Sequence, residues 1–234
     1  MQKIFISEKG ECSRNVLYIL GEMMPKLTFC GASSGLRYCK DRTLLVIETD
    51  EKYEPYLRDF VVEKIAEVIC IAYKYDILNE SVVTASLTPS EREILLAELI
   101  AADLPDDIAY VSELLSKDEI YQFDGFFSFR LNPLKEKWKR ISDSIPVTFR
   151  NDQLFDFIEF IIEDNRGTLY LKGGEVFNDS YQKLHRAGLI ANDEFALIRE
   201  IILSGARDVL CLSDLPETES AFLQKYYGER VIFA

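Results

Sequence analysis

The sequence contains few of the residues that build metal sites and disulfide frameworks. Its 234 residues include one histidine, His185, and five scattered cysteines with no C-x-x-C pair. An odd, scattered set of cysteines does not indicate a disulfide framework and fits a reducing compartment better. With one histidine and no cysteine cluster, a tetrahedral zinc site would need an unusual set of ligands. We therefore expect no metal site and no other cofactor.

Long apolar runs are also absent. No stretch approaches the roughly 18 consecutive apolar residues that indicate a membrane span. The apolar start of the chain turns polar at residues 7–9, so it lacks the apolar run of a secretory signal. These two absences predict a cytoplasmic protein.

Basic residues are in the minority. The chain has 27 lysines and arginines against 40 aspartates and glutamates, which gives a formal net charge of -13. Nucleic-acid binding needs basic side chains gathered on one surface, so we expect no nucleic-acid partner, although a local basic patch is compatible with this composition. Hydrophobic residues make up 48% of the chain, which is enough for a sizeable core.

Hydrophobic periodicity predicts a mixed α/β (α+β) fold with three parts along the chain, at residues 1–52, 53–165 and 166–234. The three parts could also form one continuous domain. In the first part, residues 3–6 and 43–48 are rich in the β-branched and aromatic side chains typical of strands. Between them we expect a helix that is capped by Ser13, ends at Pro25, and has an apolar face made of Val16, Leu17, Leu20 and Met24.

The central part is predicted to be helical. Charged residues such as Glu67 and Lys74 fall on other faces of one long predicted helix. Its apolar residues recur every three or four positions: Leu57, Val61, Ile65, Val68, Ala72 and Tyr75. A second helix start is indicated at Thr88–Glu91, which combines a cap, a proline and a capping-box glutamate. Further helices are expected at 103–115, 133–145 and 152–163.

The last part is predicted to mix strands and helices. Residues 168–177 indicate a β-hairpin, because Gly173 and Gly174 tolerate the positive φ of a tight turn. His185 is expected near the C-terminus of a helix that ends at Gly188, where a histidine needs no catalytic role. The remaining segments favour a small α/β layer: a helix at 195–203, a strand at 208–212, a helix at 216–227 and a strand at 230–233.

Residues 31–35 match G-x-S-x-G, the nucleophile elbow of α/β-hydrolases, with Ser33 as the serine. That motif needs a strand before the serine and a helix after it. A strand is conceivable at 27–29, but residues 36–41 have no helical pattern, so a turn between strands is the preferred interpretation. No acid–base pair stands out among the acidic residues either. We expect a protein without enzymatic activity, and a hydrolase that uses Ser33 is the alternative.

The most unusual stretch is residues 123–145. Four phenylalanines surround Gly125, Arg130 and Leu131 follow, and Asn132-Pro133 is a good helix start. The apolar stripe of this helix consists of Leu134, Trp138, Ile141 and Ile145. The basic residues that flank the stripe are Lys135, Lys137, Lys139 and Arg140. Between 129 and 150 there are six basic and two acidic residues, which reverses the charge of the whole chain.

This charge reversal has three interpretations. The aromatic residues can be core, with lysine heads reaching water. Alternatively, a surface can bind phosphate, anionic lipid or an acidic protein through Arg130, Lys135, Trp138, Lys139 and Arg140. Nucleic-acid stacking is the third reading and is disfavoured by the net charge. Arg130 lies between apolar neighbours, so we expect it to have a specific carboxylate partner, inside the fold or outside it.

The residues Gly125, Phe126, Phe129, Arg130 and Leu131 resemble the G-F-x-x-F-R-L core of the YtxC-like family of sporulation proteins from spore-forming Firmicutes. Residues 153–161 look like the family's Glu/Phe/Ile-rich segment, and the resemblance extends over 60–234. Two departures stand out: Cys211 to Asp214 replace a histidine of the penultimate strand, and Asn132-Pro133 interrupts the charged helix.

The resemblance implies a sporulation context and no established activity. Together with the missing catalytic constellation, it leads us to expect a sporulation-associated protein that binds or regulates a protein partner. Peripheral binding to anionic membrane surfaces through the helix at 133–145 is a further alternative.

Overall fold

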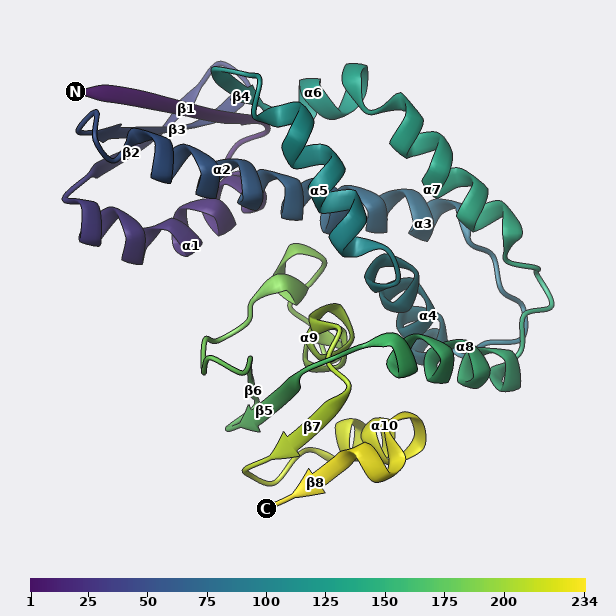
Figure 1. Ribbon diagram of the computed structural model, residues 1–234. Coiled ribbons are helices and arrows are strands. Elements are labelled where there is room, and N and C mark those ends of the chain that lie inside the picture. The colour runs from purple at the N-terminus through teal and green to yellow at the C-terminus, as the bar shows by residue number, and fades with distance from the viewer. The chain divides into compact units, whose positions relative to one another are not determined.

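The computed structural model describes all residues from 1 to 234, and the chain folds into two compact units (Figure 1). Unit 1 contains residues 1–74 and 105–137, and unit 2 contains residues 75–104 and 138–234. The chain therefore passes from one unit to the other three times. The predicted mixed α+β class is confirmed. Each unit combines two segments that are not consecutive along the chain.

Unit 1 is built on a four-stranded sheet in the order β2-β3-β1-β4. The strands are β1 (Gln2–Lys9), β2 (Ser33–Cys39), β3 (Arg42–Thr49) and β4 (Ile120–Gln122). β3 is antiparallel to both β2 and β1, and β4 is parallel to β1. One face of the sheet is buried through Ile4 and Ile6 of β1 and Leu45 and Ile47 of β3. The strands predicted at 3–6 and 43–48 are confirmed. Strand β2 is not predicted, because its apolar alternation is limited to Leu36 and Tyr38, and all seven of its residues are exposed.

Helix α1 (Arg14–Cys30) packs on this buried face of the sheet (Figure 1). Its predicted cap is confirmed, since the Ser13 hydroxyl accepts a hydrogen bond from the Val16 N–H at 3.1 Å. The predicted end at Pro25 is wrong, and so is the strand at 27–29, because the helix continues to Cys30. Pro25 is exposed, and burial of Leu27 and Cys30 beyond it outweighs the lost backbone hydrogen bond. The buried face also differs from the predicted one, as it consists of Val16, Ile19, Met23, Leu27 and Cys30.

The predicted long helix is present, with a π-helical segment in its middle. It consists of α2 (Glu54–Val68), η1 (Ile69–Tyr73) and α3 (Lys74–Ser81). The wider π turn changes which residues face the core. Lys74, expected on a polar face, is fully buried and donates a hydrogen bond to Asp107 at 3.1 Å. Glu67 is also buried, and it accepts a hydrogen bond from Lys64 at 2.7 Å.

The second segment of unit 1 supplies α5 (Leu104–Leu115), which brings Asp107 to Lys74, and α6 (Phe123–Arg130). Residues 123–130, the phenylalanine-rich start of the unusual stretch 123–145, therefore form a short helix. Phe123 and Phe126 are buried, and the Phe127 ring meets the Tyr73 ring edge-on at 4.7 Å. The following helix, α7 (Asn132–Ser144), begins at the predicted Asn-Pro pair.

Unit 2 contains a second four-stranded sheet, in the order β6-β5-β7-β8. Its strands are β5 (Thr168–Lys172), β6 (Glu175–Phe177), β7 (Asp208–Cys211) and β8 (Val231–Phe233). β5 and β6 form the predicted hairpin, whose turn residues Gly173 and Gly174 have φ of 60° and 75°. β5, β7 and β8 are parallel, which confirms the predicted α/β layer.

The helices of unit 2 agree largely with the predictions: α4 (Pro89–Ala101), α8 (Asn151–Asp164), α9 (Ala196–Ser204) and α10 (Glu217–Tyr226), with short 3-10 turns η2 (Arg186–Leu189) and η3 (Gly228–Arg230). The helix predicted around His185 is wrong. The Asn178 side chain accepts hydrogen bonds from the N–H groups of Ser180 and Gln182 at 3.0 and 2.9 Å, and Tyr181 has a φ of 55°. This local turn competes with helix formation.

None of the helices combines the length and the apolar composition that crossing a bilayer requires.

All five cysteines are free thiols, of which Cys12 and Cys39 are exposed and the other three are buried.

Candidate functional site

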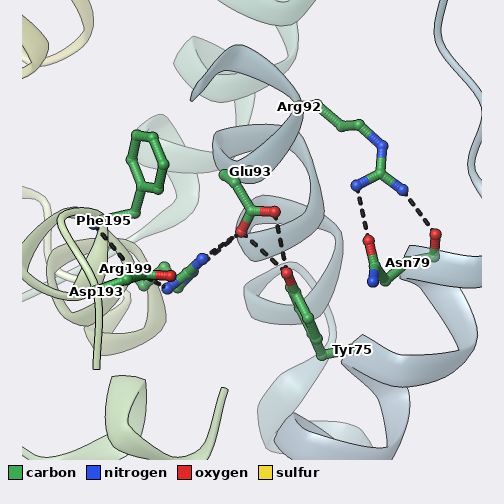
Figure 2. A network of polar contacts seen from close by, with 7 residues as sticks. All are labelled: Tyr75, Asn79, Arg92, Glu93, Asp193, Phe195 and Arg199. Carbon is green, nitrogen blue, oxygen red and sulfur yellow. Dashed lines mark hydrogen bonds and ion pairs between the residues drawn. The ribbon is translucent and has the colours of Figure 1, made fainter. Parts of the chain in front are cut away.

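The most developed polar site lies in unit 2, around the ion pair of Glu93 and Arg199 (Figure 2). Glu93 comes from the second turn of α4 and Arg199 from the first turn of α9. Only 3% of the Arg199 side chain is exposed. Its guanidinium donates to Glu93 through both Nε, at 3.2 Å, and Nη2, and its Nη1 donates to Asp193 at 2.7 Å.

Two aromatic rings complete this network. The Tyr75 hydroxyl donates to the two carboxylate oxygens of Glu93 at 3.0 and 3.1 Å. The rings of Tyr75 and Phe195 lie 5.9 and 5.8 Å from the Arg199 guanidinium carbon, within the range of cation–π attraction. Burial, followed by the charge of Glu93, raises the pKa of Tyr75 to about 12. Tyr75 therefore stays protonated at neutral pH and acts as a hydrogen-bond donor.

Local sequence holds these side chains in place. The predicted capping box starts α4, with the Glu91 N–H donating to Thr88 at 3.3 Å and the Thr88 N–H donating to Glu91 at 3.0 Å. Asp193 accepts the Phe195 N–H at 2.9 Å in the turn before α9. Burial opposes ionisation of Asp193, but the hydrogen bond from Arg199 outweighs it and lowers the pKa of the carboxyl.

Arg92, next to Glu93 in sequence, points to the end of α3. It donates to the side-chain and backbone oxygens of Asn79, both at 2.7 Å, and to the Val82 carbonyl at 3.2 Å. Figure 2 shows this contact beside the Glu93 network. Arginine is suited to this position, because its planar fork satisfies several of the carbonyls that a helix end leaves unpaired.

A pocket of about 380 Å³ opens beside the network, lined by Tyr75, Leu87, Thr88, Pro89, Arg92, Glu93, Asp193, Phe195 and Arg199. Its two arginines and two carboxylates balance in charge, and each of the four already has a partner within unit 2. The arrangement is suited to holding α4 and α9 together and to admitting a small polar molecule. No sequence pattern predicts this site. The available signal is the charged pair Arg199 and Glu200 inside the otherwise apolar segment 197–203.

The structure distributes the predicted binding residues over different environments. Arg130 is half-exposed and binds both carboxylate oxygens of Asp118, at 2.6 and 2.8 Å, so its expected carboxylate partner lies within the fold. Lys135 donates to the Ser128 carbonyl at 2.8 Å. Trp138 is fully buried, whereas Lys139 and Arg140 are exposed and form no ion pair.

The residues of the family-like motif also divide between core and surface. Phe126 and Leu131 are buried, and nothing within 4 Å would meet a side chain at Gly125. Phe129 is 82% exposed. Packing therefore accounts for two of these residues and leaves Phe129 facing solvent.

The elbow geometry around Ser33 is absent. A helix, α1, precedes the motif, and Ser33 is the first residue of strand β2, so the order is helix, turn, strand. Gly31 ends α1 with a φ of 61°, which is the common left-handed helix end. The structure shows no cluster of three or more His, Cys, Asp or Glu side chains placed as metal ligands.

Unit 1 has an apolar surface that the sequence did not indicate. One flank of α1 faces α2: Tyr18 donates to Glu67 at 3.1 Å, and the Lys26 ammonium lies 4.3 Å from the Phe60 ring centre. The opposite flank carries Leu17 and Met24. Helix α1 packs on β3 and β1, whereas α2 packs mainly on β1 among the strands, so the flank of α1 that faces away from α2 is on the β2 side of the sheet.

Strand β2 extends the same surface. Leu36 and Tyr38 are paired with Leu45 and Thr43 of β3, which are buried on the helix-covered face, so their side chains point to that face as well. The exposed fractions of Leu17, Met24, Leu36 and Tyr38 are 43, 49, 42 and 51%. We call these four residues the α1–β2 surface.

No family model, curated protein or solved structure matches this chain in the comparisons with known proteins.

Proposed function

We propose that this chain is a protein-binding or regulatory protein without catalytic activity, that it acts in the cytoplasm of sporulating cells, and that a protein partner docks on the α1–β2 surface. The proposal rests on two observations: four apolar side chains of α1 and β2 are half-exposed, and β2 is an edge strand that pairs only with β3. Such patches are typical of interaction sites, and strand edges add backbone hydrogen bonds to them.

The polar groups of the two other candidate sites, around Arg199 and Arg130, already have partners within the fold, which favours the α1–β2 surface as the docking site. The charged side chains around Arg199 are paired within unit 2, and Arg130 and Lys135 are bonded to Asp118 and Ser128. Groups that already have partners have less to gain from a ligand, because a new contact replaces an existing one. The sporulation setting rests on the resemblance at residues 125–131, and the negative net charge favours protein over nucleic acid.

Affinity capture from extracts of sporulating cells tests the proposal. The bait is compared with Leu36→Lys, which places a charge in the α1–β2 surface, and with Phe160→Lys, the matched control on the exposed side of α8. We expect a partner that is lost with Leu36→Lys and kept with Phe160→Lys. Loss with Lys135→Glu or Lys139→Glu instead would transfer the interface to α7.

The non-enzymatic part of the proposal has a separate test. A serine-directed covalent probe should leave the wild-type chain unlabelled, because Ser33 lacks the elbow geometry that exposes and activates a nucleophile. Labelling that disappears in Ser33→Ala would contradict the proposal and favour a hydrolase.

A further inference from the structure

Strand β2 is an edge strand that unit 1 leaves open. It lies at the end of the order β2-β3-β1-β4, pairs only with β3, and all seven of its residues are exposed. Every second residue of an edge strand directs its backbone N–H and C=O groups away from the sheet. Folded proteins usually protect such an edge with proline, a bulge, several charges or a covering segment.

β2 has few of these protections. Its sequence, Ser-Ser-Gly-Leu-Arg-Tyr-Cys, contains no proline and one charge, Arg37, and it pairs with β3 without a bulge over all seven positions. A long, regular and nearly uncharged edge next to apolar side chains favours pairing with another strand. The other free edge of the sheet, β4, has only three residues.

We propose that this partner strand is the β2 of a second copy, paired antiparallel about a two-fold axis at Leu36, so that the two sheets form one continuous sheet across a homodimer. The inference rests on the proposed function, because it names the partner of the same α1–β2 surface. Leu36 is the middle of the seven residues of β2, so this register pairs the whole strand with its copy.

Side-chain complementarity supports this register. Directly opposite residues in an antiparallel pair lie on the same face of the sheet. With the axis at Leu36, the large Tyr38 lies opposite the small Ser34 of the other copy, and the two leucines meet on the axis. Arg37 lies opposite Gly35, so the charges of the two copies are not placed directly against each other. An axis at Arg37 would oppose the two guanidinium groups.

The two-fold axis also brings apolar side chains of α1 into the contact between the two copies. Ser34, Leu36 and Tyr38 point to the helix-covered face, because their partners on β3 lie on that face. The free flank of α1, with Leu17 and Met24, borders the same edge. Pairing of the two edges therefore brings the α1–β2 surfaces of both copies to one apolar strip and satisfies the open backbone groups at the same time.

Sedimentation equilibrium of the full chain tests the dimer. We expect a mass twice the 27.0 kDa of the chain for the wild type. Leu36→Lys opposes two ammonium groups on the axis, and we expect it to raise the dimer dissociation constant at least about 100-fold. Ile232→Lys is the matched control, since it makes the same change in the exposed edge strand β8 of unit 2 and should leave the dimer intact. Circular dichroism verifies that both variants are folded.

A disulfide test reads the register directly. In a Cys12→Ser/Cys39→Ser background, Leu36→Cys should form a covalent dimer under mild oxidation, because opposite residues lie within disulfide range. Tyr38→Cys alone should not, whereas Ser34→Cys combined with Tyr38→Cys should. Equal cross-linking at all these positions would contradict the register.

A wild-type monomer at all concentrations, or a dimer unchanged by Leu36→Lys, overturns the inference. If the wild type is a monomer and its captured partner is lost with Leu36→Lys, the homodimer is overturned and the proposed function still stands. If the wild type is a monomer and every variant captures the same proteins, both the homodimer and the proposed function are contradicted.

Discussion

Glu98, a single carboxyl on α4, links the stability of unit 2 to pH. The side chain is buried, it forms no ion pair, and burial raises its pKa to about 8. In the folded chain it therefore keeps its proton up to about pH 8, whereas in the unfolded chain it loses it near the ordinary value of 4.5. Between these values the folded state binds more protons, so the free energy of unfolding falls as the pH rises.

Glu98→Gln removes this titration. We expect the variant to gain stability relative to the wild type as the pH rises from 5 to 7, by on the order of 3 kcal/mol, because each pKa unit corresponds to about 1.4 kcal/mol. Urea unfolding at several pH values, followed by Trp138 fluorescence, measures the difference. Glu163→Gln changes an exposed carboxyl of α8 and should leave the pH dependence unaltered. Parallel curves for the wild type and Glu98→Gln would contradict the prediction.

The Glu93–Arg199 pair gives a second prediction for individual residues. Removing one partner leaves the other charge buried without compensation, so Glu93→Gln and Arg199→Met should each destabilise the fold by about 3–5 kcal/mol. The double variant should lose less than the sum of the two changes, because neither charge is then left alone. Denaturant midpoints of the four proteins form the cycle.

An exposed ion pair serves as the control for this cycle. Arg150 and Asp152 pair at 2.7 Å with exposed fractions of 66 and 62%, and water screens their attraction. Arg150→Ala should change stability by less than about 1 kcal/mol. Additive losses for the Glu93 and Arg199 variants would show that the two side chains act independently.

For whole helices and strands, the capping box of α4 predicts the clearest local effect. Thr88→Ala removes the hydroxyl that accepts the Glu91 N–H, and we expect a loss of about 1 kcal/mol. Thr148→Ala is the matched control, since Thr148 is exposed and makes no hydrogen bond. Thermal unfolding compares the two variants. Equal melting temperatures would mean that packing of α4 alone sets the position of its N-terminus.

Elements whose determinants are local could be predicted from the sequence. The start of α4 depends on four consecutive residues, and the hairpin turn depends on Gly173 and Gly174. The long helix from α2 to α3 was visible as an apolar repeat. In each case, the residues that decide the structure are neighbours along the chain, so their pattern is readable without tertiary contacts.

The remaining features depend on contacts that are distant along the chain. Burial of Lys74 needs the π turn of η1 and the carboxylate of Asp107, which is 33 residues away. Glu93 and Arg199 are 106 residues apart. The continuation of α1 past Pro25 is decided by the packing of Leu27 and Cys30. No local pattern specifies these pairs, so the candidate site of unit 2 could not be predicted.

In the whole molecule, the two units are interleaved along the chain rather than consecutive. Unit 2 takes most of α3 and all of α4 from the segment 75–104, and its other elements from 138–234. α4 packs against α8 and α9 and contributes a buried apolar set, Ile94, Leu95, Leu96, Leu99 and Ile100. Cutting the chain once between residues 104 and 138 therefore separates a central helix of unit 2 from the sheet that follows.

A fragment of residues 138–234 should not fold by itself. Without α4 it exposes the apolar faces of α8 and α9, and Arg199 loses Glu93, so we expect no cooperative unfolding transition by circular dichroism. Joining 75–104 to 138–234 through a flexible linker of ~15 residues restores both parts of unit 2, and this chain should unfold cooperatively. The same linker chain with Ile94→Asp and Leu95→Asp serves as the control, because its α4 can no longer be buried.

Cooperative unfolding of 138–234 alone would show that α4 is dispensable and that the unit is defined by its sheet. Non-cooperative behaviour of both chains would show instead that unit 2 needs the segment 105–137, and with it unit 1, in order to fold.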